Sequence, residues 1–129
     1  MNLTSIHHIA IICSNYERSK KFYTEILKLQ IVQEIYRKEK GSWKCDLKVG
    51  KTYQIELFSF SNPPTRTSRP EACGLRHLAF EVNDLDATVR ELEAKGVVVE
   101  PIRNDETRGG KRFTFFLDPD NLPLEICEK

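Results

Sequence analysis

Two histidines and two glutamates recur at one fixed spacing along this chain of 129 residues. His8 and His77 are 69 positions apart, and Glu56 and Glu125 are separated by the same 69 positions. All four lie in apolar, strand-like runs, where ionisable side chains are rarely placed unless they are paired or bind a metal. Two imidazoles and two carboxylates suit one divalent ion, and Ni, Co, Mn, Fe and Zn all accept such ligands. The spacing therefore predicts one metal site formed by His8, Glu56, His77 and Glu125.

Each of these residues also has a simpler interpretation when it is taken alone. A single histidine in an apolar strand is more often a hydrogen-bonded core residue than a ligand. Glu56 alone could be a polar position of an alternating edge strand. His7 is a rival to His8, but only His8 has a counterpart at the repeat spacing. The repeat favours the metal because it duplicates the ionisable residues together with their apolar neighbours.

The elements around these residues follow one pattern twice. In the first half we expect a helix that begins after Ser14-Asn15 and four strands, at 6–13, 30–38, 42–49 and 52–60. In the second half we expect a helix at 85–95, a loop at 104–110 and four strands, at 76–82, 97–102, 111–117 and 122–127. Each half reads β-α-β-β-β. The prediction is an α+β fold of two tandem βαβββ modules that form a cupped mixed sheet.

The module boundaries follow from a proline-rich segment in the middle of the chain. We expect one domain over residues 1–129, with module 1 at about 3–60, a surface linker at 61–74 and module 2 at about 75–128. Strand alternation puts Ile9 and Ile11 on the face that the helix covers, and His8 beside Ala10 on the opposite face. His77 repeats this arrangement. Two such sheets facing each other would bring both histidines and both glutamates into one concavity.

Composition excludes several classes of partner. The chain is 40% hydrophobic with a formal net charge of +1, and its Lys and Arg residues are scattered among acids. This balance gives no reason to expect a nucleic acid or a membrane as partner. The apolar stretch at 9–13 is far too short for a signal peptide core or a membrane span. We expect a cytoplasmic protein that binds a small-molecule substrate.

Thiols and arginines supply further candidates for the site. Four cysteines without a Cys-x-x-Cys pair are expected to be free thiols. Cys127 shares strand parity with Glu125, so a catalytic thiol there stays open. Arg66, Arg69 and Arg112 could orient an anionic substrate or could be solvated loop cations.

Several segments resemble the vicinal oxygen chelate superfamily, and within it the glyoxalase I (lactoylglutathione lyase) branch. The resemblance covers essentially the whole chain, and its carriers are His8-Ile9-Ala10-Ile11, residues 18–23 with Ile26-Leu27, Ile55-Glu56-Leu57, residues 75–80 and residues 118–126. It implies a metal-dependent lyase or isomerase that transfers a proton alpha to a carbonyl through a metal-bound enediolate. It also implies that the same four residues are the metal ligands and that Glu125 is the base. Residues 112–116 and 68–74 are similar to small bacterial glyoxalase-like proteins of unsettled substrate.

Two positions depart from the pattern of the glutathione-dependent members. Those proteins typically have Arg four residues after the first ligand histidine and Asn four residues after the first ligand glutamate. This chain has Ile12 and Phe60 there, so we expect a glutathione adduct to be a poor substrate.

Other activities of the superfamily remain as alternatives. Extradiol-type dioxygenases and fosfomycin-type thiol transferases use three protein ligands, and the fourth candidate ligand, Glu56, counts against both. Non-catalytic small-molecule-binding relatives lose the ligands, whereas this chain keeps all four. We expect a homodimer in which each ion is held by His8 and Glu56 of one chain and by His77 and Glu125 of the other, with a site inside one chain as the alternative.

Overall fold

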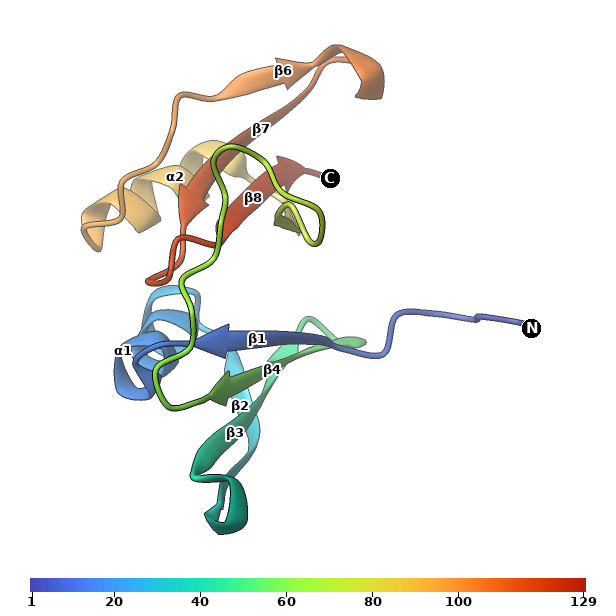
Figure 1. Ribbon diagram of the computed structural model, residues 1–129. Helices are drawn as coiled ribbons and strands as arrows, with labels where there is room; N and C mark the ends of the chain where they lie inside the picture. The colour runs from blue at the N-terminus through green and yellow to red at the C-terminus, as the bar shows by residue number, and fades with distance from the viewer. The chain divides into compact units, whose positions relative to one another are not determined.

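Two βαβββ units of similar length make up the chain in the computed structural model, which describes residues 1–129 apart from the side chain of Tyr53. Unit 1 comprises Met1–Thr65 and unit 2 comprises Arg66–Lys129 (Figure 1). The predicted α+β class and the two tandem βαβββ modules are confirmed, and each unit has a mixed four-stranded sheet of its own. That the two form one domain stays a prediction. Among the helices that the structure describes, none has both the length and the apolar character that a membrane crossing requires.

Unit 1 builds its sheet in the order β1-β4-β3-β2. Its elements are β1 (Ile9–Cys13), α1 (Tyr16–Lys21), a π-helical turn η1 (Phe22–Ile26), β2 (Gln30–Arg37), a 3₁₀ turn η2 (Lys38–Lys40), β3 (Ser42–Val49) and β4 (Tyr53–Ser59). Strand β1 pairs in parallel with β4, and the other pairs are antiparallel. Asn15 caps α1 by accepting a hydrogen bond of 3.0 Å from the backbone N–H of Arg18.

The two faces of the unit 1 sheet differ in burial. Ile11 and Cys13 of β1 and Leu57 of β4 are buried on the side that α1 and η1 cover. Ala10 and Ile12 are exposed on the opposite face, as strand alternation predicts. Residues 1–8 have no regular secondary structure and extend away from β1 (Figure 1). His8 therefore lies immediately before the strand, which begins later than predicted.

Unit 2 repeats this topology in the order β5-β8-β7-β6. Its elements are β5 (Leu78–Val82), α2 (Leu85–Ala94), β6 (Arg103–Asp105), a 3₁₀ turn η3 (Glu106–Arg108), β7 (Lys111–Leu117) and β8 (Pro123–Glu128). Asp84 caps α2 by accepting a 2.8 Å hydrogen bond from the backbone N–H of Ala87. As in unit 1, the histidine, His77, comes just before the first strand.

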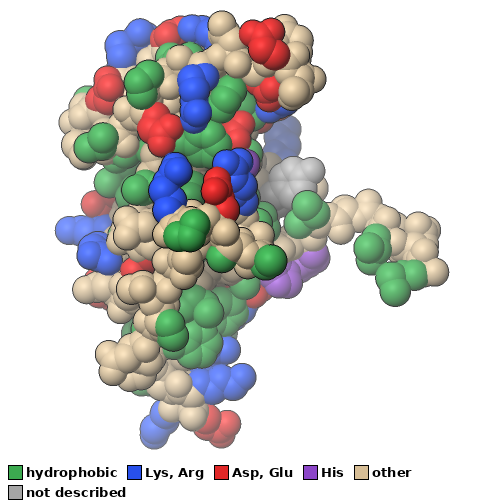
Figure 2. Space-filling view, turned by 45° about the horizontal axis from the view of Figure 1, so that its top comes forward, with side chains coloured by type: hydrophobic (Ala, Val, Ile, Leu, Met, Phe, Trp, Pro, Cys, Tyr) green, Lys and Arg blue, Asp and Glu red, His purple; other side chains and the backbone are tan. Residues whose placement is uncertain are grey.

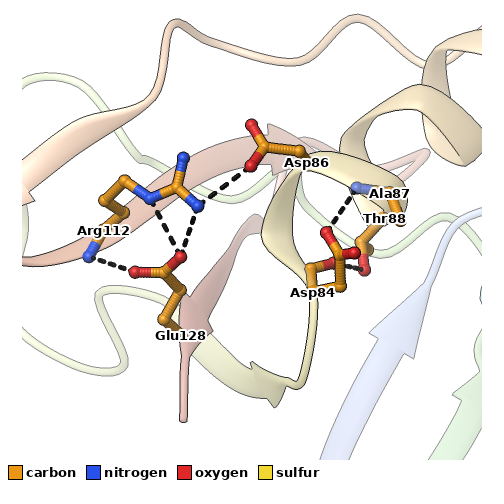
Figure 3. A network of polar contacts seen from close by, with 6 residues as sticks. All are labelled: Asp84, Asp86, Ala87, Thr88, Arg112 and Glu128. Atoms are coloured by element: carbon orange, nitrogen blue, oxygen red, sulfur yellow. Dashed lines mark hydrogen bonds and ion pairs between the residues drawn. The ribbon is translucent and has the colours of Figure 1, made fainter.

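Arg112 ties three elements of unit 2 together (Figure 3). Its Nε donates to Glu128 on β8 at 2.9 Å, and its Nη2 donates to Asp86 on α2 at 2.9 Å. These ion pairs hold the pKa of both carboxyl groups below their ordinary values and raise the pKa of the guanidinium. Arg112 is therefore neither a solvated loop cation nor free for a substrate. It fastens α2 to the two inner strands of the sheet, β7 and β8.

One strand of the sequence prediction is wrong. Residues 97–102 form no strand, and β6 lies instead at Arg103–Asp105, inside or next to the loop that was predicted at 104–110. The segment does approach β7, because the Glu100 N–H donates to the Phe115 carbonyl at 2.8 Å. Pro101 lacks a backbone N–H and interrupts the ladder directly after this contact. Regular pairing begins only beyond it, with Arg103 opposite Phe113.

The second part of the predicted linker is attached to unit 2. The guanidinium of Arg66 donates to the Leu75 carbonyl at 2.8 Å and to the Ser68 hydroxyl at 2.6 Å. Ser68 in turn donates to the Asn121 carbonyl at 3.2 Å. Arg66 thus fixes the path of the linker rather than serving as a free surface cation.

Candidate metal centre

The first histidine and the first glutamate meet on the open face of unit 1. Parallel pairing of β1 with β4 sets Ala10 directly beside Glu56, and His8 precedes Ala10 by two residues on the same face. His8 Nε2 lies 3.6 Å from Glu56 Oε2, and the two side chains are 40% and 14% exposed. His7 does not displace His8 in this pair but contacts it, with 2.8 Å between their Nδ1 atoms.

The second pair has the same construction in unit 2. Parallel pairing of β5 with β8 sets Ala79 beside Glu125. His77 Nε2 lies 3.1 Å from Glu125 Oε2, and the Glu125 residue is only 8% exposed. In both units an alanine is the glutamate's neighbour on the parallel strand, so the side chain on that side of the carboxylate is small.

The two carboxylates have different surroundings. Glu56 on β4 lies directly opposite Asp46 on β3. The Nζ atom of Lys44 lies 3.0 Å from the Glu56 carboxylate and 2.6 Å from the Asp46 carboxylate. Burial alone lowers the pKa of Lys44, but its contacts with the two carboxylates outweigh burial and raise it. At the repeat spacing, unit 2 has Phe113 and Phe115 in place of Lys44 and Asp46.

The phenylalanines give Glu125 an apolar wall. Phe115 is its cross-strand partner on β7, and the Phe115 ring packs edge-on against the His77 ring with centroids 5.2 Å apart. Among the described residues, His77 is the one ion-pair partner of Glu125 within 4.0 Å. A buried carboxylate in such a setting favours a cation as partner.

The donor set of each unit fits a divalent ion. An imidazole nitrogen and a carboxylate oxygen converge in each pair, and both are common ligands of first-row transition metals. Within the part of the chain that the structure describes, no group of three or more His, Cys, Asp or Glu side chains is arranged to hold a metal ion. Each unit thus brings two candidate ligands together, and the site of four residues stays a prediction.

Unit 2 has a cavity of about 1000 Å³ in front of the second pair. His77, Glu125, Phe113 and Phe115 line it, together with residues of the linker and of the β6–η3 segment. Cys127 is not part of this lining, although it shares strand parity with Glu125. Its sulfur lies 3.6 Å from the Phe80 carbonyl oxygen, and all four cysteines are free thiols, as predicted.

Sequence reasoning missed four charged residues near the two pairs. Lys44 and Asp46 share strand parity, but only the register of β3 against β4 shows that they face Glu56. Arg103 and Arg108 line the cavity of unit 2 and lie in or beside the segment that was predicted as a loop. On the face drawn in Figure 2, Lys and Arg side chains are intermingled with Asp and Glu, so composition alone does not mark these residues.

Comparison with known protein families decides which fold family this arrangement represents. The model of the Glyoxalase/Bleomycin resistance protein/Dioxygenase superfamily matches residues 5–126. The chain belongs to this superfamily. The match takes in both histidine–glutamate pairs and confirms the resemblance to the vicinal oxygen chelate fold.

Similar proteins extend over the full length of this superfamily member. The uncharacterized protein YwkD of Bacillus subtilis is 61% identical over 129 residues, covering 100% of both chains. The uncharacterized protein YaeR of Escherichia coli is 55% identical over 129 residues, covering 100% of this chain and 99% of that one. The crystal structure of a glyoxalase family protein from Enterococcus faecalis superposes with a TM-score of 0.90 at 45% identity, covering 99% of this chain and 100% of that chain.

Proposed function

We propose that this protein is a metal-dependent lyase or isomerase of the glyoxalase I type, which moves a proton on a carbon next to a carbonyl group. In this proposal His8, Glu56, His77 and Glu125 hold one divalent ion. The observation that carries it is the duplicated pairing of histidine with glutamate, at 3.6 Å in unit 1 and 3.1 Å in unit 2. A repeat that duplicated only the apolar packing of the two units would not be expected to keep both the histidine and the glutamate of each pair.

Glu125 is the proposed proton carrier. A divalent ion at the site would act as a Lewis acid toward the substrate carbonyl. Of the two candidate ligand carboxylates, Glu125 is the one that lines the cavity, and Phe115 stands beside it on β7. Glu56 is held by Lys44 at 3.0 Å, so its carboxylate is less free to move toward a substrate. The asymmetry of the two carboxylates thus supports Glu125 as base and Glu56 as a fixed ligand.

The substrate is not expected to be a glutathione adduct. Ile12 is 55% exposed and Phe60 is 42% exposed, and neither can donate a hydrogen bond to a carboxylate or an amide. Hydrogen bonds to charged groups contribute about 1.5–3 kcal/mol each. Without two such contacts, binding of a glutathione adduct should be weaker by roughly two or more orders of magnitude.

More distant relatives support both the leading activity and its rival. Glyoxylase I 4 of Arabidopsis thaliana is 26% identical over 134 residues, and the mitochondrial methylmalonyl-CoA epimerase of Homo sapiens is 28% identical over 103 residues. A manganese-dependent 2,3-dihydroxybiphenyl 1,2-dioxygenase of Geobacillus is 30% identical over 127 residues, although only 35% of that protein is covered. A dioxygenase would consume O₂, whereas proton transfer would not.

Assembly as a homodimer is part of the proposal. We infer that each ion is bound by His8 and Glu56 of one chain and by His77 and Glu125 of the partner. Mixing His8→Ala with Glu125→Gln chains tests this, because one of the two sites in a mixed dimer would then be intact. Activity should return in part. Mixed dimers that form and stay inactive would place each site within one chain.

A turnover assay tests the chemistry. Metal-loaded protein is supplied with 2-oxoaldehyde adducts of several thiols, including glutathione, and turnover is divided by the metal actually bound. Glu125→Gln should reduce turnover per bound ion by about 10²–10⁴-fold, as expected for loss of a general base. Glu93→Gln on the outer helix α2 is the matched control and should change nothing. Equal turnover per ion in both variants would refute Glu125 as the base, and O₂ consumption would favour the dioxygenase.

A further inference from the structure

Arginine side chains gather around the cavity of unit 2. The lining includes Arg66, Arg69, Arg76, Arg103 and Arg108, together with the acids Glu71, Glu100, Asp105, Glu106 and Glu125. Arg66 donates to backbone carbonyls that fix the linker, and Arg76 pairs with Glu71 of the linker at 3.1 Å. Arg103 and Arg108 are the arginines that the β6–η3 segment carries to the cavity.

Arg103 lies on the aromatic wall that also contacts the candidate metal ligand. Its guanidinium is 5.0 Å from the Phe113 ring centroid and 5.4 Å from the Phe115 ring centroid. Phe115 also packs edge-on against His77. A guanidinium that lies over aromatic rings can still donate its N–H groups to an acceptor. An exposed ion pair with Glu100 at 3.1 Å uses one of those groups.

Arg108 approaches the same region from the end of η3. A hydrogen bond to the Cys127 side chain is the main cause that raises the pKa of Arg108, and attraction to Asp105 and Glu125 adds to it. Arg108 lines the same cavity as Glu125 of β8. Asp105 at the start of this turn accepts hydrogen bonds from the backbone N–H and the hydroxyl of Thr107, at 2.9 and 2.6 Å.

We propose that Arg103 and Arg108 form an anion-binding subsite that holds a carboxylate or phosphate group of the substrate inside the unit 2 cavity. Planar guanidinium groups match the paired oxygens of both anions. The phenylalanine wall suits an apolar body attached to the anion. The assignment rests on the proposed function only in making this ligand the substrate, because anion binding itself needs no catalysis.

Binding of simple probes to the full-length protein as purified tests the subsite. Isothermal titration calorimetry with phenylacetate, inorganic phosphate and the neutral phenylacetamide measures each dissociation constant. We expect one or both anions to bind and the neutral amide to bind far more weakly. Arg103→Gln and Arg108→Gln should each weaken anion binding roughly tenfold. Arg90→Gln on α2 removes the same charge away from the cavity lining and should have no effect.

The possible results distinguish a phosphate ligand from a carboxylate ligand. They also test the anion subsite independently of the proposed function. Selective binding of phosphate would indicate a phosphorylated substrate, and selective binding of phenylacetate would indicate a carboxylate. Unchanged anion binding in the Arg103 and Arg108 variants, or equal weakening by Arg90→Gln, would overturn the subsite. Metal content and turnover measured on the same samples test the proposed function separately, since a protein can bind these anions without holding an ion.

Discussion

Replacing Lys44 with methionine should have opposite effects on stability and on metal binding. Lys44 Nζ contacts both Asp46 and Glu56, at 2.6 and 3.0 Å, and its side chain is 27% exposed. Without the ammonium group, two carboxylates face each other across β3 and β4 with no cation between them. Lost contacts and like-charge repulsion together should lower the free energy of unfolding of the metal-free protein by about 2 kcal/mol. For a chain of 129 residues that corresponds to a decrease in melting temperature of roughly 7 °C.

The same substitution should strengthen metal binding. Two unit charges about 4 Å apart interact by about 1 kcal/mol even in water, so a lysine and a divalent ion repel each other by about 2 kcal/mol. Removing Lys44 should therefore raise metal affinity roughly tenfold or more. The exposed Lys48→Met on the same strand is the matched control and should alter neither quantity strongly. Differential scanning calorimetry without metal and a competitive chelator titration give the two measurements. Weaker metal binding by Lys44→Met would contradict the placement of the ion at Glu56.

Two further predictions concern the framework of unit 2. Because Arg112 holds the pKa of the Glu128 and Asp86 carboxyls below their ordinary values of 4.5 and 3.8, its contribution to stability is complete above those values and is lost as the pH falls through the folded-state values. Melting curves should show Arg112→Gln less stable than the parent at pH 7 and nearly equal to it in strong acid; a constant difference would be evidence against the ion pairs. Asp84→Ala removes the α2 cap and should cost about 1 kcal/mol in urea denaturation, whereas the exposed Glu93→Ala should cost little.

Local signals in the sequence were sufficient for much of the fold. The bounds of β3 and β7 agree with prediction because turns with glycines of positive φ, Gly41, Gly50 and Gly110, border them. The position of β6 was not predictable in the same way. Its pairing depends on β7, and Pro101 excludes the apolar segment that alternation favours as the strand. The π-helical turn after α1 also has no local signal that we recognised.

The two histidine–glutamate pairs could be predicted from strand alternation and from the 69-residue repeat. Parallel pairing of β1 with β4 and of β5 with β8 brings each histidine to its glutamate, and a fixed repeat spacing implies this without knowledge of the register. The neighbours of each pair could not be found this way. Lys44 reaches Glu56, and Arg103 reaches Phe115, through antiparallel partners whose alignment is set by tertiary packing.

Metal content of purified variants tests the central claim most directly, namely that His8, Glu56, His77 and Glu125 bind one ion. Elemental analysis should give about one divalent ion per chain in the parent protein. His8→Ala and Glu125→Gln should each lose most of it, although the two residues belong to different units. His7→Ala, which removes the neighbouring imidazole, should retain the ion. Equal metal content in all three variants would contradict the assignment.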